Sequence, residues 1–312
     1  PEEEGSILVV TVDGKGVPMR RKASERPGDG RKRRRKGEKA NKKREACVGG
    51  VYSIEPFVRT PQHIVNDTLR KRCREDRPEP RHKRLRAELT RPIDGQEVRG
   101  KELTFRWLVE EVTRRRQPGQ PLIFLSDGDD ALHRMQRDHL PGAVCILDIY
   151  HAVERLWDAA TCFHPEGSQE ANDFVTQRLE RILEGKVGHV VGGLRQMATK
   201  HRLRGSRLAQ LNGAVGYLSN QRAYMSYDEY LAKGYPIGSG VAEGACRHLV
   251  KDRMEGTGMR WIVPGAQAML HLRAVWLNDD WDAFQNRRAQ EEQRLLHPYR
   301  SLVQQQWERK AA

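Results

Sequence analysis

The sequence has no long hydrophobic run and few cysteines, and each absence excludes a class of protein. No apolar segment approaches the roughly 18 residues that a membrane-spanning helix needs. The five cysteines are odd in number and include no Cys-x-x-Cys pair, so neither a disulfide framework nor structural zinc within this chain is indicated. There is no signal-peptide pattern and no internal repeat. We therefore expect reduced thiols, a cytoplasmic location and no membrane contact.

The length and composition fit a globular protein. An apolar content of 37% with 28 glycines among 312 residues allows a substantial core. The length suits a catalytic domain with a large insertion, or two domains. The chain opens at Pro1 without a Met, and its first strand-like run follows almost at once. We therefore expect a fragment of a longer protein.

Positive charge is concentrated in one segment. Residues 20–44 contain 14 Lys/Arg and three Asp/Glu, net +11, whereas the whole chain carries +14. The densest part is the run Arg31, Lys32, Arg33, Arg34, Arg35 and Lys36. Such a loop is attracted to phosphate backbones, although it could also be a solvated loop that aids solubility. The pI near 9.8 favours a nucleic-acid partner without choosing DNA over RNA.

Hydrophobic periodicity predicts an α/β protein. The predicted strands are residues 6–12, 45–54, 84–89, 121–126 and 143–147. The predicted helices are residues 96–116, 131–140, 151–163, 170–183, 187–203, 207–220, 241–254 and 266–278, with a polar terminal helix or tail over 291–312. Residues 59–80 are polar and broken by prolines, and no strand signal occurs between Tyr150 and Gly234. This order predicts a mixed sheet with helices on both faces, followed by an all-helical segment.

Three carboxylates stand out against this pattern. Asp13 and Asp127 end the first and fourth strand-like runs, and each precedes a glycine. If those strands are neighbours, the two carboxylates meet where α/β sites usually lie. Glu243 lies far downstream on a predicted helix. Three carboxylates from distant parts of a chain are what a two-metal phosphodiester site needs, and carboxylate oxygens are ligands that Mg²⁺ prefers.

Each of these signals also has a plainer interpretation. An Asp-Gly pair after a strand is most often a turn. Glu243 could form an ordinary i, i+4 ion pair with Arg247 on a helix surface. Asp148 follows a buried run, so it needs a cation or hydrogen-bond donors, and it could simply pair with His151 or an arginine.

A cationic stretch follows Glu243 in the sequence. Its members are Arg247, His248, Lys251, Arg253, Arg260 and Trp261. The glycine-rich approach at Gly238 and Gly240 would let a phosphate backbone come close to the helix start. The stretch suits a DNA-contacting face, or equally a solvated surface with Trp261 in the core.

Seven patterned segments carry a family resemblance. They are residues 11–19, 46–52, 147–151, 163–168, 235–249, 251–255 and 258–261, within a match from about residue 6 to about residue 285. In these segments the chain resembles bacterial insertion-sequence transposases of the ISKra family, which have a ribonuclease-H-like DDE catalytic domain. The resemblance implies that Asp13, Asp127 and Glu243 are the catalytic carboxylates and hold two Mg²⁺ ions, with Mn²⁺ as a substitute.

The resemblance also implies a role for an Asp-x-x-His signature. Related Mutator-like and hAT-type transposases carry it roughly twenty residues after the second carboxylate, and Asp148 lies 21 residues after Asp127 here. Asp148 and His151 would then support the site or handle a DNA strand. Asp148 also remains an alternative second metal ligand, because Asp129 and Asp130 crowd the turn at Asp127.

The implied activity is cleavage of element ends and strand transfer into target DNA by a homo-oligomer in the bacterial cytoplasm, associated with the nucleoid. The implied organisation is a ribonuclease-H-like core over residues 1–150 with the basic loop 20–44, a helical insertion over 151–235, a catalytic-glutamate helix and closing helices over 236–285, and a polar tail over 286–312. The alternatives are a nuclease or resolvase on the same fold and a noncatalytic DNA-binding remnant of a transposase. An RNA-binding protein ranks below these, because the sequence has no stacking-platform motif.

Overall fold

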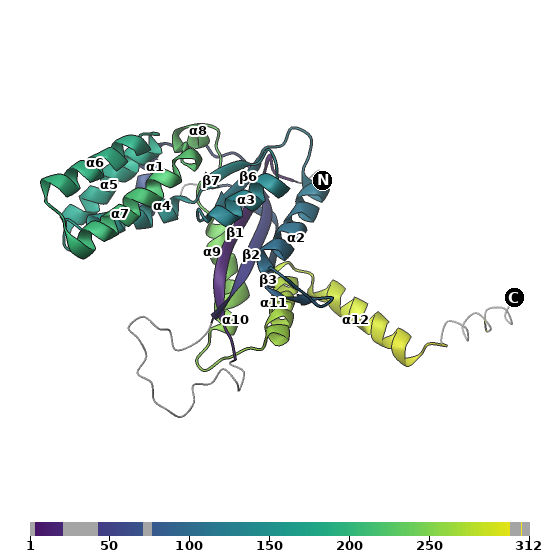
Figure 1. The fold of residues 1–312 in the computed structure, drawn as a ribbon. Coiled ribbons are helices and arrows are strands. Elements are labelled where there is room, and N and C mark those ends of the chain that lie inside the picture. Colours follow the sequence, from purple (N-terminus) through teal and green to yellow (C-terminus); the bar gives the residue numbers. More distant parts are fainter. Residues whose placement is uncertain (1–3, 21–42, 71–76, 300–306, 308–312) are drawn as a thin grey trace, which may run out of the picture.

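The computed structural model of the chain describes residues 4–20, 43–70, 77–299 and 307 (Figure 1). The basic run Arg31–Lys36, and nearly all of the predicted basic loop, lie outside the described residues. The four described cysteines are free thiols, which agrees with the expected absence of a disulfide framework. Within the described ranges no helix combines the length and apolarity that a membrane crossing requires.

Five strands form one mixed sheet in the order β3-β2-β1-β6-β7. They are β1 (Ile7–Pro18), β2 (Lys43–Ile54), β3 (Arg81–Leu89), β6 (Leu122–Ser126) and β7 (Val144–Leu147). The first three pair antiparallel, whereas β1, β6 and β7 run parallel. All five predicted strands are confirmed, and the first and fourth of them in the sequence, β1 and β6, are neighbours.

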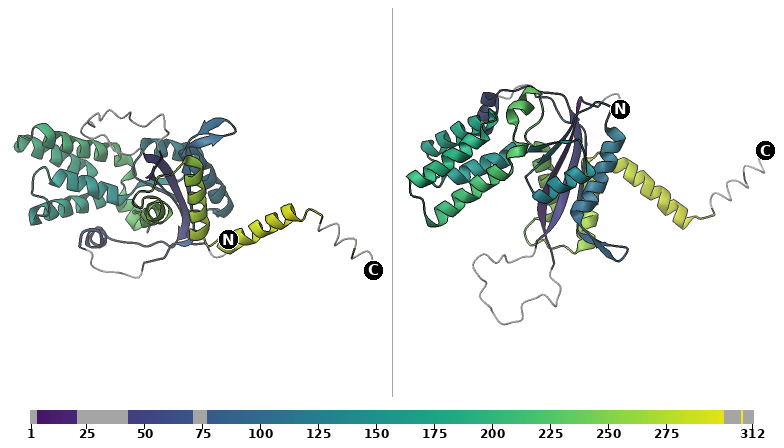
Figure 2. Two further views of the ribbon diagram at one scale, coloured as in Figure 1. Left: turned by 90° about the horizontal axis from the view of Figure 1, so that it is seen from below. Right: turned by 45° about the horizontal axis from the view of Figure 1, so that its top comes forward.

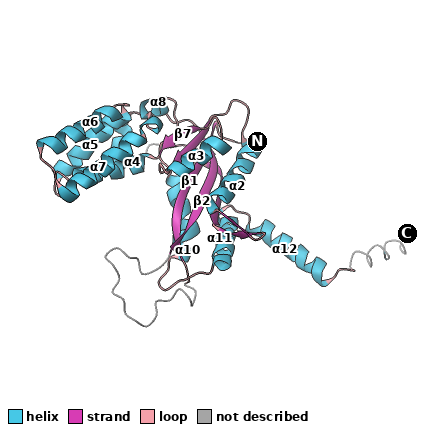
Figure 3. Ribbon diagram, in the orientation of Figure 1, coloured by secondary structure: helices cyan, strands magenta, loops and turns pink. Residues whose placement is uncertain are grey.

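Helices cover both faces of this sheet, because alternate side chains of each strand point to opposite faces and both sets are apolar (Figures 1 and 3). On one face, α2 (Gly100–Arg115) and α3 (Asp130–His139) pack against a cluster that includes Val10 and Phe124. On the other face, a second cluster joins the strands to the chain's later helices: α9 (Gly240–Ala245), the π-helical η4 (Cys246–Lys251), α10 (Asp252–Met254) and α11 (Val263–Leu277). The predicted layering is therefore confirmed.

A helical block lies to one side of the sheet, between β7 and α9 in the sequence (Figure 2). Its elements are α4 (Ile149–Ala160), α5 (Gln169–Leu183), α6 (Val187–Lys200), α7 (Gly205–Asn220), η3 (Arg222–Tyr224) and α8 (Tyr227–Ala232). Apolar faces of these helices meet in one cluster that continues to the sheet through Ile123 and Leu125. The prediction of an all-helical segment after the last strand is confirmed.

The predicted helix over residues 96–116 begins too early. Residues Gln96–Val98 form β5, which pairs with β4 (Arg91–Ile93) in a small hairpin. Asp94 and Gly95, both with positive φ, form its two-residue turn. The helix therefore starts only at Gly100.

Three further features of the fold differ from the sequence prediction. β1 runs past Asp13 to Pro18, because β2 continues to pair with it after β6 has ended. The polar stretch contains α1 (Pro61–Val65) and η2 (Asn66–Arg70), since Thr60 caps a helix that has proline in its first turn. The last long helix, α12 (Trp281–Leu296), starts before the predicted tail, has no buried residue and projects from the body in Figure 1.

Candidate functional site

Strand register aligns three carboxylates at one edge of the sheet. Val12 of β1 is paired with Ser126 of β6, and Ser126 in turn with Leu147 of β7. Asp13, Asp127 and Asp148 directly follow these three residues in the sequence, and neighbouring strands lie about 4.8 Å apart. The backbone register therefore places Asp13 and Asp127 at neighbouring positions of adjacent strands, and Asp148 continues the same row.

The Asp13 side chain contacts η4, the helical segment that directly follows α9 and its residue Glu243. Its Oδ1 accepts a hydrogen bond from the Gly14 N–H at 2.6 Å, and its Oδ2 accepts one from the Cys246 thiol at 3.2 Å. Cys246 begins η4, three residues after Glu243 and on the same side of the helix. The sequence prediction missed Cys246, although its i+3 spacing from Glu243 could have indicated it.

Asp127 lies in a tight turn after β6. Its Oδ1 accepts the Asp129 N–H at 3.0 Å, and its carbonyl oxygen accepts the Tyr217 hydroxyl at 2.5 Å. Gly128 has a φ of 86°, and a Cβ there would lie 2.9 Å from the Tyr217 hydroxyl oxygen. The turn that the Asp-Gly pair suggested is therefore present, and α7 of the helical block fixes it.

Asp148 is buried and fully provided with donors. Its Oδ1 caps α4 by accepting the Tyr150 N–H at 2.9 Å. Its Oδ2 accepts the Ser239 N–H at 2.9 Å and also the Ser239 hydroxyl. The pairing considered with His151 is absent, because the His151 side chain lies 3.4 Å from Glu154 instead. Asp148 thus joins the start of α4 to the loop that leads into α9.

Glu243 lies within electrostatic reach of two members of this row. Its side chain is exposed, yet partial burial raises its pKa, and the charges of Asp148 and Asp13 raise it further, while His151 lowers it. The i, i+4 pair with Arg247 is not formed, because Arg247 lies 3.6 Å from Asp252. Since like charges disfavour ionisation of Glu243, a cation among these carboxylates would lower its pKa.

Asp13, Asp127 and Glu243 offer only oxygen donors, which is the donor set that Mg²⁺ takes. In the described part of the chain, however, no three His, Cys, Asp or Glu side chains are gathered closely enough to hold a metal ion. The π-helical turns of η4, directly after Glu243, are a kind of irregularity that often occurs at functional sites.

The cationic stretch after Glu243 is largely exposed. Arg247, His248, Lys251, Arg253 and Arg260 are all exposed, and His248 is 2.9 Å from Asp252. Trp261 differs from them. It is half-buried, its indole N–H donates to the Met254 carbonyl at 3.1 Å, and its ring packs on the cluster beneath η4 and α11. This favours the interpretation in which Trp261 belongs to the core.

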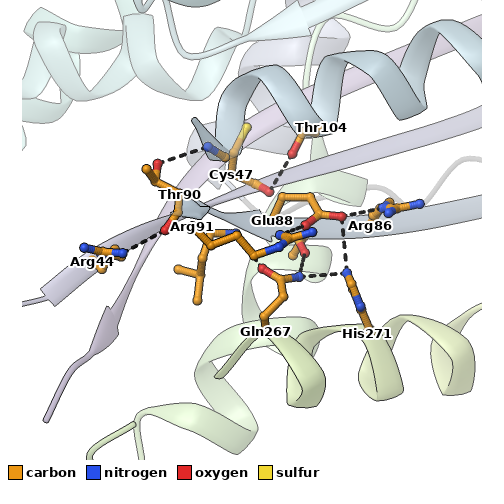
Figure 4. A network of polar contacts seen from close by, with 12 residues as sticks. Arg44, Cys47, Arg86, Glu88, Thr90, Arg91, Thr104, Gln267 and His271 are labelled. Carbon is orange, nitrogen blue, oxygen red and sulfur yellow. Dashed lines mark hydrogen bonds and ion pairs between the residues drawn. The ribbon is translucent and has the colours of Figure 1, made fainter. Parts of the chain in front are cut away.

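A second buried carboxylate, Glu88 of β3, has a separate network of polar partners (Figure 4). Arg86 donates to its Oε1 at 2.7 Å, Arg91 pairs with its Oε2, and His271 lies 3.2 Å away. Burial alone would raise the pKa of Glu88, but hydrogen bonds from His271, Arg91 and Arg86 outweigh it and lower the pKa to about 2. Because its partners lie on β3, β4 and α11, we interpret Glu88 as a structural link between these elements. The sequence analysis did not single out Glu88, because no local pattern indicates this contact.

No family model and no curated protein matches the chain.

Proposed function

We propose that this chain is the catalytic part of a DNA transposase of the DDE type, with a ribonuclease-H-like core. The observation that carries the proposal is the register of β1, β6 and β7, which aligns Asp13 with Asp127 at the point where the parallel pairing of β1 with β6 ends. Two further features support it: the β3-β2-β1-β6-β7 order with its mixed strand directions, and the helical block that separates β7 from Glu243. The resemblance of the sequence to ISKra-family transposases supplies the reaction.

In this proposal Asp13, Asp127 and Glu243 hold two Mg²⁺ ions, for which Mn²⁺ can substitute. Bound Mg²⁺ supplies activation of a water or a DNA 3′-hydroxyl and stabilisation of the leaving oxygen. Asp148 fixes the loop before α9 and thereby the position of Glu243. Lys251 and Arg253, exposed on the same helical segment, neutralise phosphate charge. The DNA partners are the element's terminal repeats and its target, and the acting form is a homo-oligomer.

The test is nicking and joining of supercoiled plasmid DNA with Mg²⁺ or Mn²⁺. Neutral variants of similar shape, Asp13→Asn, Asp127→Asn and Glu243→Gln, should each reduce metal-dependent nicking at least about a hundredfold while DNA affinity stays within about threefold, because they remove metal-binding charge and not DNA contacts. Glu229→Gln, an exposed carboxylate on α8, is the matched control.

The outcome also separates the related functions. Strand joining in addition to nicking supports a transposase, whereas nicking alone supports a nuclease or resolvase on the same fold. Wild-type nicking by Glu243→Gln would remove that residue from the site. DNA binding with neither reaction would support a noncatalytic remnant.

A further inference from the structure

We propose that a pocket beside the carboxylates binds one unpaired nucleotide of a DNA strand. The inference rests on the proposed function in one respect, namely that the neighbouring carboxylates act on a phosphodiester of that strand. The pocket has a volume of about 270 Å³ and opens between the end of β2, η2, the start of α4 and the loop before α9. Ligand sites for drug-sized molecules begin near 300 Å³, so this pocket suits a ligand of about one nucleotide.

The pocket and the carboxylates share two chain segments. Tyr150, which lines the pocket, is two residues after Asp148, and Gly240, also in the lining, is three residues before Glu243. Burial raises the pKa of Tyr150, and the charges of Asp148 and Glu243 raise it further. A nucleotide held here would therefore leave an adjoining phosphate of the same strand next to the carboxylate row.

Arg59 gives the pocket an anion-binding group. Its Nη2 donates to the Tyr235 carbonyl at 2.8 Å and its Nε to the Phe57 carbonyl at 3.3 Å. It is half-buried and has no ion-pair partner among the described residues, whereas Arg77, also in the lining, is paired with Asp67. Burial lowers the pKa of Arg59. The Phe57 ring lies 5.7 Å from the Arg59 guanidinium, and the charge of Asp67, which is paired with Arg77, favours the protonated form of Arg59. A guanidinium that is partly out of water and makes no ion pair of its own among the described residues is suited to a phosphate.

Tyr150 gives the pocket a surface for a base. Its side chain is 40% exposed, and a Cβ on Gly238 would lie 3.1 Å from the ring, so the glycine allows the ring to pack close to the loop. Ile237 and Val241 add apolar wall. Bases stack on aromatic rings without regard to sequence, and a base reaches a recessed pocket only when it is unpaired and out of its stack. Aromatic and apolar walls together with a guanidinium match the two parts of a nucleotide, its base and its phosphate.

The experiment measures binding alone, in EDTA, so that no cleavage occurs. Fluorescence of 2-aminopurine reports binding of duplexes that carry the analogue in an unpaired overhang or in a paired position. We expect the overhang to bind about tenfold more tightly, and Tyr150→Ala to abolish most of that preference, because one stacked base contributes about a tenfold effect or more. Tyr299→Ala, another exposed tyrosine, is the control and should keep the preference.

A second pair of variants tests the anion contact. Arg59→Met keeps the side-chain stem but removes the charge, and should weaken binding of the overhang more than binding of the paired duplex, whereas Arg106→Met on α2 should affect neither. Circular dichroism shows whether Arg59→Met is folded. If it is not, the result for Tyr150→Ala alone tests the pocket.

Three results would overturn the inference. They are equal affinity for paired and unpaired positions, a preference that survives Tyr150→Ala, and free deoxyadenosine 5′-monophosphate binding as tightly as the overhang, which would indicate a small-molecule site. Failure of the pocket and failure of the proposed function are distinguishable. An overhang preference without plasmid nicking would retain the pocket and remove the enzyme, and nicking without the preference would do the reverse.

Discussion

At the residue scale, two carboxylates of the site have opposite surroundings. Asp148 is buried and accepts three hydrogen bonds, so its charge is already satisfied. Glu243 is exposed, its carboxylate has no hydrogen bond within the described residues, and its pKa is raised. A satisfied buried carboxylate fixes structure, whereas an unsatisfied one among like charges is available to a cation. This contrast favours Asp148 as the positioning residue and leaves the ligand role to Glu243 and its partners.

Ser239→Ala tests the positioning role. Loss of the hydroxyl leaves one lone pair of a buried carboxylate unsatisfied, so the free energy of unfolding should fall by about 1–3 kcal/mol. The measurement is urea denaturation followed by circular dichroism. Ser206→Ala, at an exposed position of α7, is the control and should change stability by less than about 0.5 kcal/mol. Equal stability of the two variants would mean that the Ser239 hydroxyl does not hold Asp148.

At the scale of elements, polar side chains as well as apolar packing join the helices to the sheet. Gln267 of α11 bonds the β3 backbone on both sides of Glu88, accepting from the Leu89 N–H at 2.8 Å and donating to the Ala87 carbonyl at 3.0 Å. His271, one turn later, lies against the Glu88 carboxylate itself. Helix α11 is therefore held in one register on β3, and with it the adjoining η4 and Glu243.

The Glu88 network makes stability depend on pH. The pKa of Glu88 is lowered from 4.5 to about 2 in the folded chain, so its stabilisation is fully present above about pH 4.5 and is lost as pH falls toward 2. The full effect is on the order of 3 kcal/mol. The free energy of unfolding, measured by urea denaturation between pH 6 and pH 3, should fall less steeply in Glu88→Gln than in the wild type. Parallel pH curves would contradict the assignment.

A glycine sets the closest approach of α2 to the sheet. A Cβ on Gly100 would lie 2.5 Å from the Glu88 carbonyl oxygen, so Gly100→Ala forces backbone to move and should destabilise the fold by about 1–3 kcal/mol. Gly213, an exposed position within α7, has open space around its Cα, and Gly213→Ala should stabilise by up to about 1 kcal/mol. Urea denaturation of both variants measures the difference. A stable Gly100→Ala variant would contradict the predicted approach.

At the scale of the whole molecule, the helical block lies to one side of the sheet and α12 extends from the other end (Figure 2). The carboxylate row lies where the block joins the sheet, because Asp148 caps the start of α4 and the Tyr217 hydroxyl of α7 donates to the Asp127 carbonyl. Exposed cations of η4 and α10 follow Glu243 in the chain. If the chain binds DNA as proposed, these cations would be available to contact phosphates beside the carboxylates.

Salt dependence of DNA binding tests these contacts. If Lys251 and Arg253 each contact a phosphate, the slope of log affinity against log salt concentration should become shallower by about 0.9 for each residue replaced by alanine. Lys200→Ala, an exposed lysine at the end of α6, should leave the slope unchanged. Fluorescence anisotropy over a salt series provides the measurement, and an unchanged slope in the double variant would place the DNA path elsewhere.

Local pattern alone determined the elements that bury a continuous apolar run or a periodic face. Four of the five sheet strands and helices α4 to α7 of the block were predicted within a few residues, because burial dictates that pattern locally. The sequence prediction ended β1 six residues too early and missed the short helix α8. The sequence prediction missed the β4–β5 hairpin because no residue of these two strands is fully buried. It missed α1 because Thr60-Pro61 suggested a break, whereas Thr60 caps a helix that starts at Pro61.

The sequence predicted which residues belong to the candidate site, but only the tertiary structure determined how they are arranged. The sequence identified Asp13, Asp127, Glu243 and Asp148, but it left open which of them are fixed and which are free. Ser239 and Cys246 are separated from their aspartate partners by 91 and 233 residues, and no local pattern encodes a contact across such a distance. Sheet register aligned Asp13, Asp127 and Asp148. The pairing of β1 with β6 and of β6 with β7 is set by burial of whole strands and not by the carboxylates themselves.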